Sequence, residues 1–228
     1  MTRLTLFDLD HTLLSGDSEM AWGEFLLARG HLDAAIHAER CADWQRQYRE
    51  GTLDVPAYYA FQLSLLTPFR RHELEALRRE YLSERVEPML TRRSRALVAE
   101  RLAAGDLVAI VTATHRFLTE PIAALFGVEH LLATEPEADA AGDFTGRLIG
   151  EPCLREGKIV HVDAWLARLG RRWEDFDQRW FYSDSVNDIP LLEKVDRPVA
   201  VDPDPRLLAH ATARGWAVLS LRDEEGLE

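Results

Sequence analysis

The sequence has few cysteines and no long hydrophobic run, and each shortage excludes a class of protein. Cys41 and Cys153 are its only cysteines, and no C-x-x-C pair is present, so neither a disulfide framework nor a zinc site is indicated. No apolar stretch approaches the ~20 residues of a membrane span. The start of the chain has no apolar h-region or small-residue cleavage site of a signal peptide. We therefore expect a cytoplasmic protein with no membrane partner.

Basic residues are also in short supply. Lys and Arg number 27 against 39 Asp and Glu, which gives a net charge of -12 at pH 7. Such a chain repels a polyanion unless a local basic stripe overcomes the net charge. The arginine pairs at 70–71, 92–93 and 171–172 stand among acidic residues, as on a solvated helix face. We therefore expect no nucleic-acid partner, and nothing in the sequence indicates an obligate protein partner.

Short apolar runs that end in a carboxylate or a hydroxyl group recur along the 228 residues. They predict four buried strands, at 4–8, 107–112, 180–184 and 199–202. Helical patterns lie between them, at 94–104, 117–126 and 159–169, and a glycine terminates each. The alternation predicts an α/β fold, a Rossmann-like parallel sheet with helices on both faces. The segment 143–150 is predicted to be a short hairpin.

One interval is too long for this pattern. Asp10 and Thr112 are 102 positions apart, whereas a crossover connection needs only one helix. Apolar residues in the interval recur at helical spacings, and Asp54-Val55-Pro56 is typical of a helix start. We expect an inserted α-helical bundle over the carboxyl edge of the sheet. The predicted domains are an α/β catalytic core at 1–16 and 87–228 and a helical cap domain at 17–86. Three aromatic residues on its apolar stripes are interpreted as packing residues: Trp44, Tyr48 and Tyr81.

The residues that could carry chemistry follow the predicted strands. Asp8 and Asp10 end the first strand, and on a regular strand they would point the same way. Beside a phosphate, one carboxylate can attack phosphorus while the other carries the proton of the leaving group. Phosphoryl transfer also needs hydroxyl groups, a cation and metal ligands. The sequence supplies them in Thr112, in Lys158 and in Asp184, Asn187 and Asp188. Oxygen ligands of this kind favour magnesium.

In these motifs the chain resembles the haloacid dehalogenase-like superfamily, and within it the phosphatases similar to phosphoserine phosphatase. Four motifs carry the resemblance: Asp8-x-Asp10-x-Thr12-Leu13, Thr112, Gly157-Lys158 and Asp184-x-x-Asn187-Asp188. The first and the last are specific, whereas a lone Thr or Lys is weak. The long interval between the first two motifs matches one of the places where this family inserts a cap.

The resemblance implies a role for each matching residue. Asp8 would be the nucleophile and Asp10 the general acid and base, while Thr112 and Lys158 would bind the phosphate. The implied cofactor is Mg²⁺, and its implied ligands are Asp8, Asp184 and the backbone carbonyl of Asp10, supported by Asn187 and Asp188. Two departures concern substrate: Thr112-Ala113-Thr114 replaces Ser-Gly-Gly and adds a hydroxyl near the phosphate, and Ser183 stands where glycine is frequent.

The expected substrate is a small phosphorylated metabolite, because a helical lid can enclose one. Within the resemblance, phosphoserine and histidinol phosphate are the two candidates, and both carry an ammonium group. Asp17 stands about where phosphoserine phosphatases place an acidic residue that contacts the substrate amine. The alternative interpretation of Asp17 is a helix N-cap. His11 is interpreted as a local structural residue.

Other functions are compatible with parts of this pattern. A dehalogenase would use Asp8 but leaves Asp10 and Asp184 unexplained. A receiver domain phosphorylates an aspartate that is not in the first strand, and it has no large helical insertion. A phosphomutase or phosphotransferase would pass the phosphoryl group to a second hydroxyl instead of water. A non-catalytic module that senses a metabolite could share the fold, since fold does not fix function.

Overall fold

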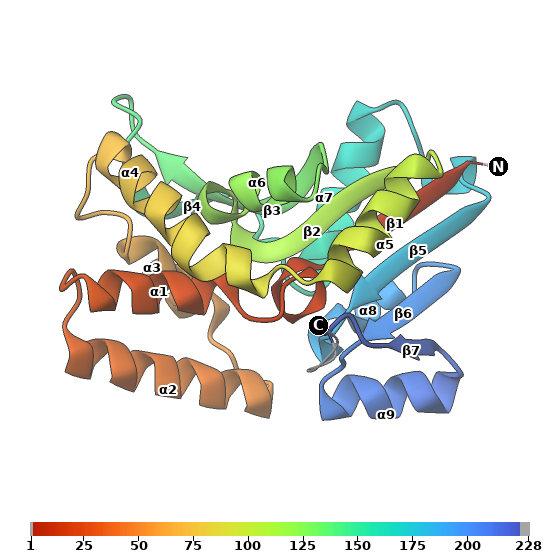
Figure 1. Ribbon diagram of the computed structural model, residues 1–228, viewed down its shortest axis with the longest axis horizontal. Helices are drawn as coiled ribbons and strands as arrows, with labels where there is room; N and C mark the ends of the chain where they lie inside the picture. The colour runs from red at the N-terminus through yellow and green to blue at the C-terminus, as the bar shows by residue number, and fades with distance from the viewer. Residues whose placement is uncertain (1, 224–228) are drawn as a thin grey trace.

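The computed structural model describes residues 2–223, without the side chains of residues 45, 48 and 49. Within these residues seven strands form one sheet in the order β4-β3-β2-β1-β5-β6-β7 (Figure 1). The strands are β1 (Arg3–Phe7), β2 (Leu107–His115), β3 (His130–Ala138), β4 (Phe144–Ile149), β5 (Gln178–Ser183), β6 (Arg197–Val201) and β7 (Ala217–Leu219). All neighbours are parallel except β3 and β4. The predicted Tyr48 packing lies outside the described side chains.

Helices follow most strands. They are α1 (Ser18–Ala28), α2 (Ala34–Glu50), α3 (Val55–Ser64), α4 (Arg71–Tyr81), α5 (Arg92–Ala103), α6 (Arg116–Leu125), α7 (Glu156–Arg168), α8 (Ile189–Leu192) and α9 (Pro205–Arg214). Of the described helices, none is long and apolar enough to cross a membrane.

Alternating side chains on the central strands fill two separate cores. In β2, Val108 and Ile110 pack with α5 and α6, whereas Ala109 and Val111 pack with α7, α8 and α9 on the other face. Because successive strand residues point to opposite faces, a strand that is apolar throughout must be covered on both sides. This arrangement confirms the predicted α/β fold with helices on both faces.

The long insertion contains helices α1 to α4, which gather at the end of the molecule opposite the N-terminus (Figure 1). Asp54 caps α3 by accepting a hydrogen bond from the Ala57 N–H at 3.1 Å, with Pro56 in the first turn, as the sequence predicted. Tyr81 is fully buried, and its hydroxyl donates to the Ser18 carbonyl at 2.6 Å. Its predicted packing role is confirmed.

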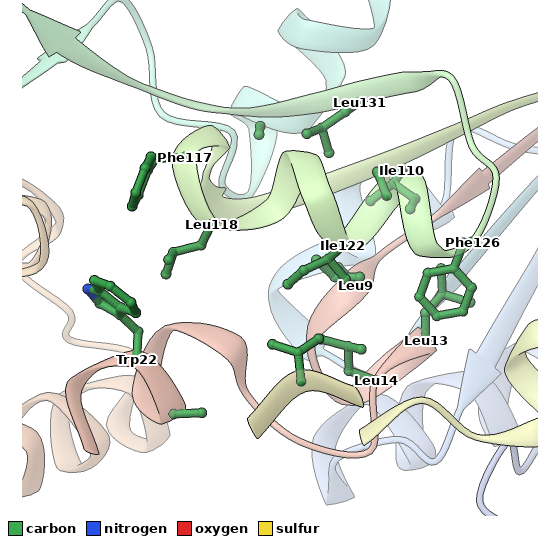
Figure 2. Packing of buried hydrophobic residues seen from close by; sticks show 14 of the residues in the cluster. Leu9, Leu13, Leu14, Trp22, Ile110, Phe117, Leu118, Ile122, Phe126 and Leu131 are labelled. Carbon is green, nitrogen blue, oxygen red and sulfur yellow. The ribbon is translucent and has the colours of Figure 1, made fainter. Parts of the chain in front are cut away.

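One hydrophobic cluster joins this helical insertion to the sheet. Trp22 of α1 packs edge-on against Phe117 of α6, with ring centroids 6.3 Å apart. Leu9 and Leu13 pack beside Ile122 in the same cluster (Figure 2). The domain boundaries at 16/17 and 86/87 stay a prediction, because the apolar packing runs across them.

The prediction for residues 143–150 was wrong in detail. These residues do not fold into a hairpin by themselves, because Phe144–Ile149 is the single strand β4, antiparallel to β3. The hairpin turn lies before it, where the Asp139 carboxylate accepts from the N–H groups of Ala141 and Asp143. An Asp side chain that bonds its own downstream backbone is a frequent turn former.

Candidate active site

The chain leaves β1 immediately before the first acidic motif. The last ladder hydrogen bond runs from the Asp8 N–H to the Tyr182 carbonyl at 2.9 Å, and the turn Leu9–Leu13 follows. His11 occupies this turn at a φ of +56°, a left-handed conformation that few residues other than glycine adopt. The regular-strand geometry predicted for Asp8 and Asp10 is therefore wrong, because the strand ends at Phe7. Both residues nevertheless line one cavity.

The Asp8 carboxylate is held from two sides. Its Oδ1 accepts from Lys158 Nζ at 2.7 Å, and its Oδ2 lies 3.1 Å from the hydroxyl of Thr12. The Thr12 hydroxyl lies equally close, 3.1 Å, to Asp184 Oδ1 and accepts from the Asp184 N–H at 3.0 Å. Only 7% of Asp8 is exposed. The first and last predicted motifs therefore meet at Thr12, although 172 positions separate Thr12 from Asp184.

Lys158 forms ion pairs with two carboxylates at the wall of the cavity. Besides Asp8, its Nζ donates to Asp188 Oδ2 at 2.6 Å, and Ser183 donates to the same oxygen at 2.7 Å. Burial by itself lowers the pKa of Lys158, but the negative charges of Asp188 and Asp8 outweigh burial and raise that pKa above its ordinary value. Lys158 is therefore a permanent cation here, and Asp188 is its buried counter-ion.

Gly157 lets α7 begin close enough to the cavity to place Lys158. A Cβ atom at Gly157 would lie 2.1 Å from the Pro152 carbonyl oxygen, so no side chain fits there. Arg155, immediately before α7, has a φ of +55° and donates to Asn187 Oδ1 at 3.3 Å. Sequence reasoning missed Arg155, because its only signal is its place beside the Gly-Lys pair.

The Asp10 carboxylate has its own partners, separate from those of Asp8. Its Oδ1 accepts from the Ser18 N–H at 2.6 Å, and its Oδ2 accepts from the Thr114 hydroxyl at 2.7 Å. Burial, with the charge of Asp17, raises the pKa of Asp10 to about 6. The Thr114 hydroxyl was expected near the phosphate, but in the structure it is bonded to Asp10. Thr112 also lines the cavity, and its hydroxyl oxygen accepts from the Thr114 N–H at 3.2 Å.

The acidic side chains at the cavity are of the kind that binds a magnesium ion. Burial, followed by the charges of Asp8 and Asp188, raises the pKa of Asp184 well above its ordinary value, so a cation would relieve this site. Both oxygens of the Asp10 carboxylate already accept a hydrogen bond, from Ser18 and from Thr114. The described residues contain no ready cluster of three His, Cys, Asp or Glu side chains. A set of two carboxylates and one carbonyl contains only the hard oxygen donors that Mg²⁺ prefers.

The cavity joins these groups to the helical insertion. It has a volume of about 390 Å³ and is lined by all eight predicted site residues: Asp8, Asp10, Asp17, Thr112, Lys158, Asp184, Asn187 and Asp188. Asp17 is also the N-cap of α1, since its Oδ1 accepts from the N–H groups of Glu19 and Met20 at 2.9 and 2.8 Å. The two interpretations of Asp17 are therefore compatible.

The insertion contributes further cavity residues that sequence reasoning did not place in the site, among them Glu19, Tyr58 and Trp44. Glu19 of α1 and Tyr58 of α3 both line the cavity, and the Tyr58 hydroxyl donates to Glu19 Oε2 at 2.5 Å. Trp44 was expected to serve packing alone; it is 8% exposed, and it also lines the cavity. A signal for Glu19 existed, because it lies on the same helical stripe as the buried residues Trp22 and Leu26.

Comparison with known proteins agrees with this geometry. A histidinol-phosphatase from Neisseria meningitidis serogroup C is 38% identical over 222 residues, covering 97% of this chain and 100% of that protein. A phosphoserine phosphatase from Mycobacterium tuberculosis is 33% identical, covering 97% of this chain and 72% of that protein. A crystal structure of a Bordetella pertussis protein of unknown function has 47% identity and a TM-score of 0.92, covering 97% and 100% of the two chains.

A substrate-bound phosphoserine phosphatase shares the fold, with a TM-score of 0.69 at 19% identity over 97% of this chain and 94% of that one. The family model for haloacid dehalogenase-like hydrolases matches residues 5–193, a range that contains both acidic motifs and Lys158. With its matched motifs brought together at one cavity, this chain belongs to the haloacid dehalogenase-like hydrolases.

Proposed function

We propose that this protein is a magnesium-dependent phosphatase that hydrolyses a small phosphomonoester through an aspartyl-phosphate on Asp8. One observation carries the proposal: Asp8 faces the cavity with one oxygen on the Lys158 ammonium, while Asp10 stands apart in its own hydrogen bonds. Two carboxylates with different partners can serve as nucleophile and as proton carrier.

In the first half-reaction, an Asp8 oxygen forms a bond to phosphorus as the bond from phosphorus to the ester oxygen breaks. The departing alkoxide takes a proton from Asp10 and leaves as an alcohol. In the second, a water oxygen attacks phosphorus, its proton goes to Asp10, and the bond from phosphorus to Asp8 breaks. Inorganic phosphate leaves, and both carboxyl groups regain their starting states.

Charge neutralisation at the phosphoryl group comes from two sources in this proposal. Lys158 and the Thr112 hydroxyl supply a cation and a hydrogen-bond donor from the chain. Asp8, Asp184 and the Asp10 carbonyl would hold Mg²⁺, with Asn187 and Asp188 in support, and the ion would neutralise the phosphoryl oxygens. Lys158 is already paired with Asp8 and Asp188, and its charge offsets only part of the effect of burial and of the neighbouring carboxylates on the pKa of Asp184.

For substrate we propose histidinol phosphate, with phosphoserine as the second candidate. A histidinol-phosphatase is among the relatives that this chain matches over their full length, whereas the phosphoserine phosphatase is matched over 72% of its length. Among the described side chains lining the cavity, Lys158 is the only Lys or Arg. A substrate carboxylate would therefore find no cation beyond the one that serves the phosphate. Histidinol phosphate has no carboxylate, and its ammonium group suits Asp17.

Phosphate release tests this proposal directly. Purified protein should release inorganic phosphate from histidinol phosphate faster than from phosphoserine, lose activity when dialysed against a chelator, and regain it with Mg²⁺. Release unaffected by exhaustive chelation would contradict the magnesium requirement. Binding of the substrate without release of phosphate would indicate a sensing module, and transfer to an added alcohol in place of water would indicate a phosphotransferase.

A further inference from the structure

Glu19 is a buried acid that the proposed chemistry does not use. It is 4% exposed, and its Oε1 has no hydrogen-bond partner among the described residues, although Glu19 lines the substrate cavity. Burying a carboxylate oxygen without a partner is costly. A buried polar atom of this kind at a cavity wall therefore indicates that something else completes its hydrogen bonding.

The surroundings of Glu19 restrict what that partner can be. Oε2 is occupied by the Tyr58 hydroxyl, whose pKa burial and the Glu19 charge hold well above its usual range, so Tyr58 stays a donor. His115 Nε2 lies 3.9 Å from Oε1, too far for a hydrogen bond. Burial lowers the pKa of His115 to about 3, so this ring is neutral and is no counter-ion. Among the described residues, neither of these neighbours therefore completes the hydrogen bonding of Oε1.

Aromatic rings form the walls next to this acid. Trp44 and Tyr58 meet edge to face, with ring centroids 5.9 Å apart, and Tyr58 meets Tyr59 at 5.4 Å. All three residues line the cavity. A flat ring packs well between aromatic side chains, and a ring N–H can donate to a carboxylate at the same time.

We propose that Glu19 and Tyr58 form the subsite that binds a nitrogen heterocycle at the far end of the substrate, with the ring N–H or N–H⁺ donating to Glu19 Oε1. This inference rests on the proposed phosphatase function and deepens it. Two acids at the N-terminus of α1 would then bind different parts of the substrate: Asp17 binds the ammonium group, and Glu19 binds the ring. Glu19 is thus a specificity-determining residue and has no part in the phosphoryl transfer.

Burial of Glu19 supports this assignment. Without a ligand, burial raises the pKa of Glu19 to about 8, against the opposing effect of the Tyr58 hydrogen bond. A donor on Oε1, above all a positively charged one, favours the carboxylate form and removes part of that penalty. If Glu19 had only a structural role, its replacement would change kcat/KM equally for all substrates. If Glu19 binds the ring, only the substrate that carries the ring should be affected.

The test uses three phosphomonoesters with the full-length protein and Mg²⁺. Histidinol phosphate carries the ring and the ammonium group, phosphoethanolamine carries only the ammonium group, and propyl phosphate carries neither. Glu19→Gln should lower kcat/KM for histidinol phosphate by about 10- to 100-fold, the effect of losing one charge-assisted hydrogen bond. For the other two esters, kcat/KM of Glu19→Gln should stay within about twofold of the wild-type value. Tyr58→Phe should lower the histidinol phosphate value by a smaller factor.

Glu24→Gln is the matched control, because Glu24 is exposed on the same helix. It should leave all three values unchanged. An equal loss on all three esters in Glu19→Gln, or no loss on any, would overturn the inference while leaving the phosphatase proposal standing. If wild type hydrolyses none of the esters, the proposed function fails. Calorimetric binding of histidinol to wild type and Glu19→Gln then still decides the subsite: tenfold weaker binding in the variant supports it, and equal binding overturns it.

Discussion

Asp8 and Asp10 are two positions apart, yet their carboxylates have different partners. Asp8 is bonded to a lysine, whereas Asp10 accepts from the Ser18 N–H and the Thr114 hydroxyl. The Lys158 ammonium holds the Asp8 carboxylate in position at the cavity. Burial among neutral donors, beside Asp17, raises the pKa of Asp10 to about 6, so both of its protonation states are accessible near neutral pH.

If Asp8 is the nucleophile and Asp10 the proton carrier, Asp10→Asn should slow the two half-reactions to different degrees. An alkyl phosphate has a poor leaving group that needs the acid, so kcat/KM should fall about 100- to 10,000-fold. p-Nitrophenolate leaves without a proton, so the phosphoenzyme should still form with p-nitrophenyl phosphate, and water attack should then stall. Rapid-quench measurement should show a burst of nitrophenol close to one equivalent per site, followed by slow turnover.

The control for this experiment is Asp8→Asn, which should give neither burst nor turnover because the phosphoenzyme cannot form. Mass spectrometry of quenched Asp10→Asn protein should place the phosphoryl group on Asp8. A full burst in Asp8→Asn, or a phosphoryl group on another residue, would overturn the nucleophile assignment.

Among the elements, the strands were predictable because buried strands read as apolar runs. Residues 4–8, 107–112, 180–184 and 199–202 fall on β1, β2, β5 and β6 with small boundary shifts. Strand β3 and the two edge strands, β4 and β7, were not predicted as separate strands. β7 has only three residues, and β4 alternates half-exposed and exposed side chains over most of its length. Neither produces an apolar run, since an edge strand is covered on fewer sides.

The site was predictable to the extent that its residues belong to fixed motifs. Asp8, Asp184 and Lys158 are recognisable by spacing, and the structure brings them together through Thr12 and Asp188. Glu19 and Tyr58 are 39 positions apart on two helices of the insertion. Their contact depends on how α1 and α3 pack, and helical periodicity alone does not specify that packing.

Two substitutions at the N-cap of helix α1 should separate the two roles of Asp17. Asn caps a helix about as well as Asp, so Asp17→Asn should keep the stability of the protein but lower kcat/KM for histidinol phosphate and phosphoethanolamine, about tenfold for one lost charge. Asp17→Ala should lower both the stability and kcat/KM, and its free energy of unfolding should fall by about 1 kcal/mol. Urea denaturation and steady-state kinetics measure the two effects. If Asp17→Asn hydrolyses both amine-bearing esters with wild-type kinetics, Asp17 serves only as a helix cap.

At the scale of the whole molecule, the cavity lies where the helical insertion meets the sheet. α1 contributes Asp17 and Glu19, α3 contributes Tyr58 and Tyr59, and the end of β2 contributes Thr112 to Thr114. The Tyr59 hydroxyl donates to the Ala113 carbonyl at 3.0 Å, which ties α3 to β2. A buried acid at such a junction should affect the stability of the fold as well as the choice of substrate.

Glu19 should therefore make the ligand-free protein less stable as pH rises. Its pKa is about 8 in the folded protein against 4.5 as the ordinary value, so between these limits the folded state binds more protons than the unfolded state. By linkage, the contribution of Glu19 to the free energy of unfolding is fully present below pH 4.5 and is lost progressively up to about pH 8. The loss is on the order of several kcal/mol at most.

The titratable groups facing Glu19 do not reverse this sign. Burial keeps His115 neutral throughout the window, and Tyr58 stays protonated, while the charges of Asp17 and Asp10 further disfavour an ionised Glu19. Glu19→Gln cannot titrate, so its stability relative to wild type should increase from pH 5 to pH 8 in urea denaturation without ligand or metal. Using the difference between the two proteins cancels the titrating groups that do not interact with Glu19. A difference that is constant with pH would mean that Glu19 is ionised in the folded protein, and that its free oxygen has found a donor within the chain.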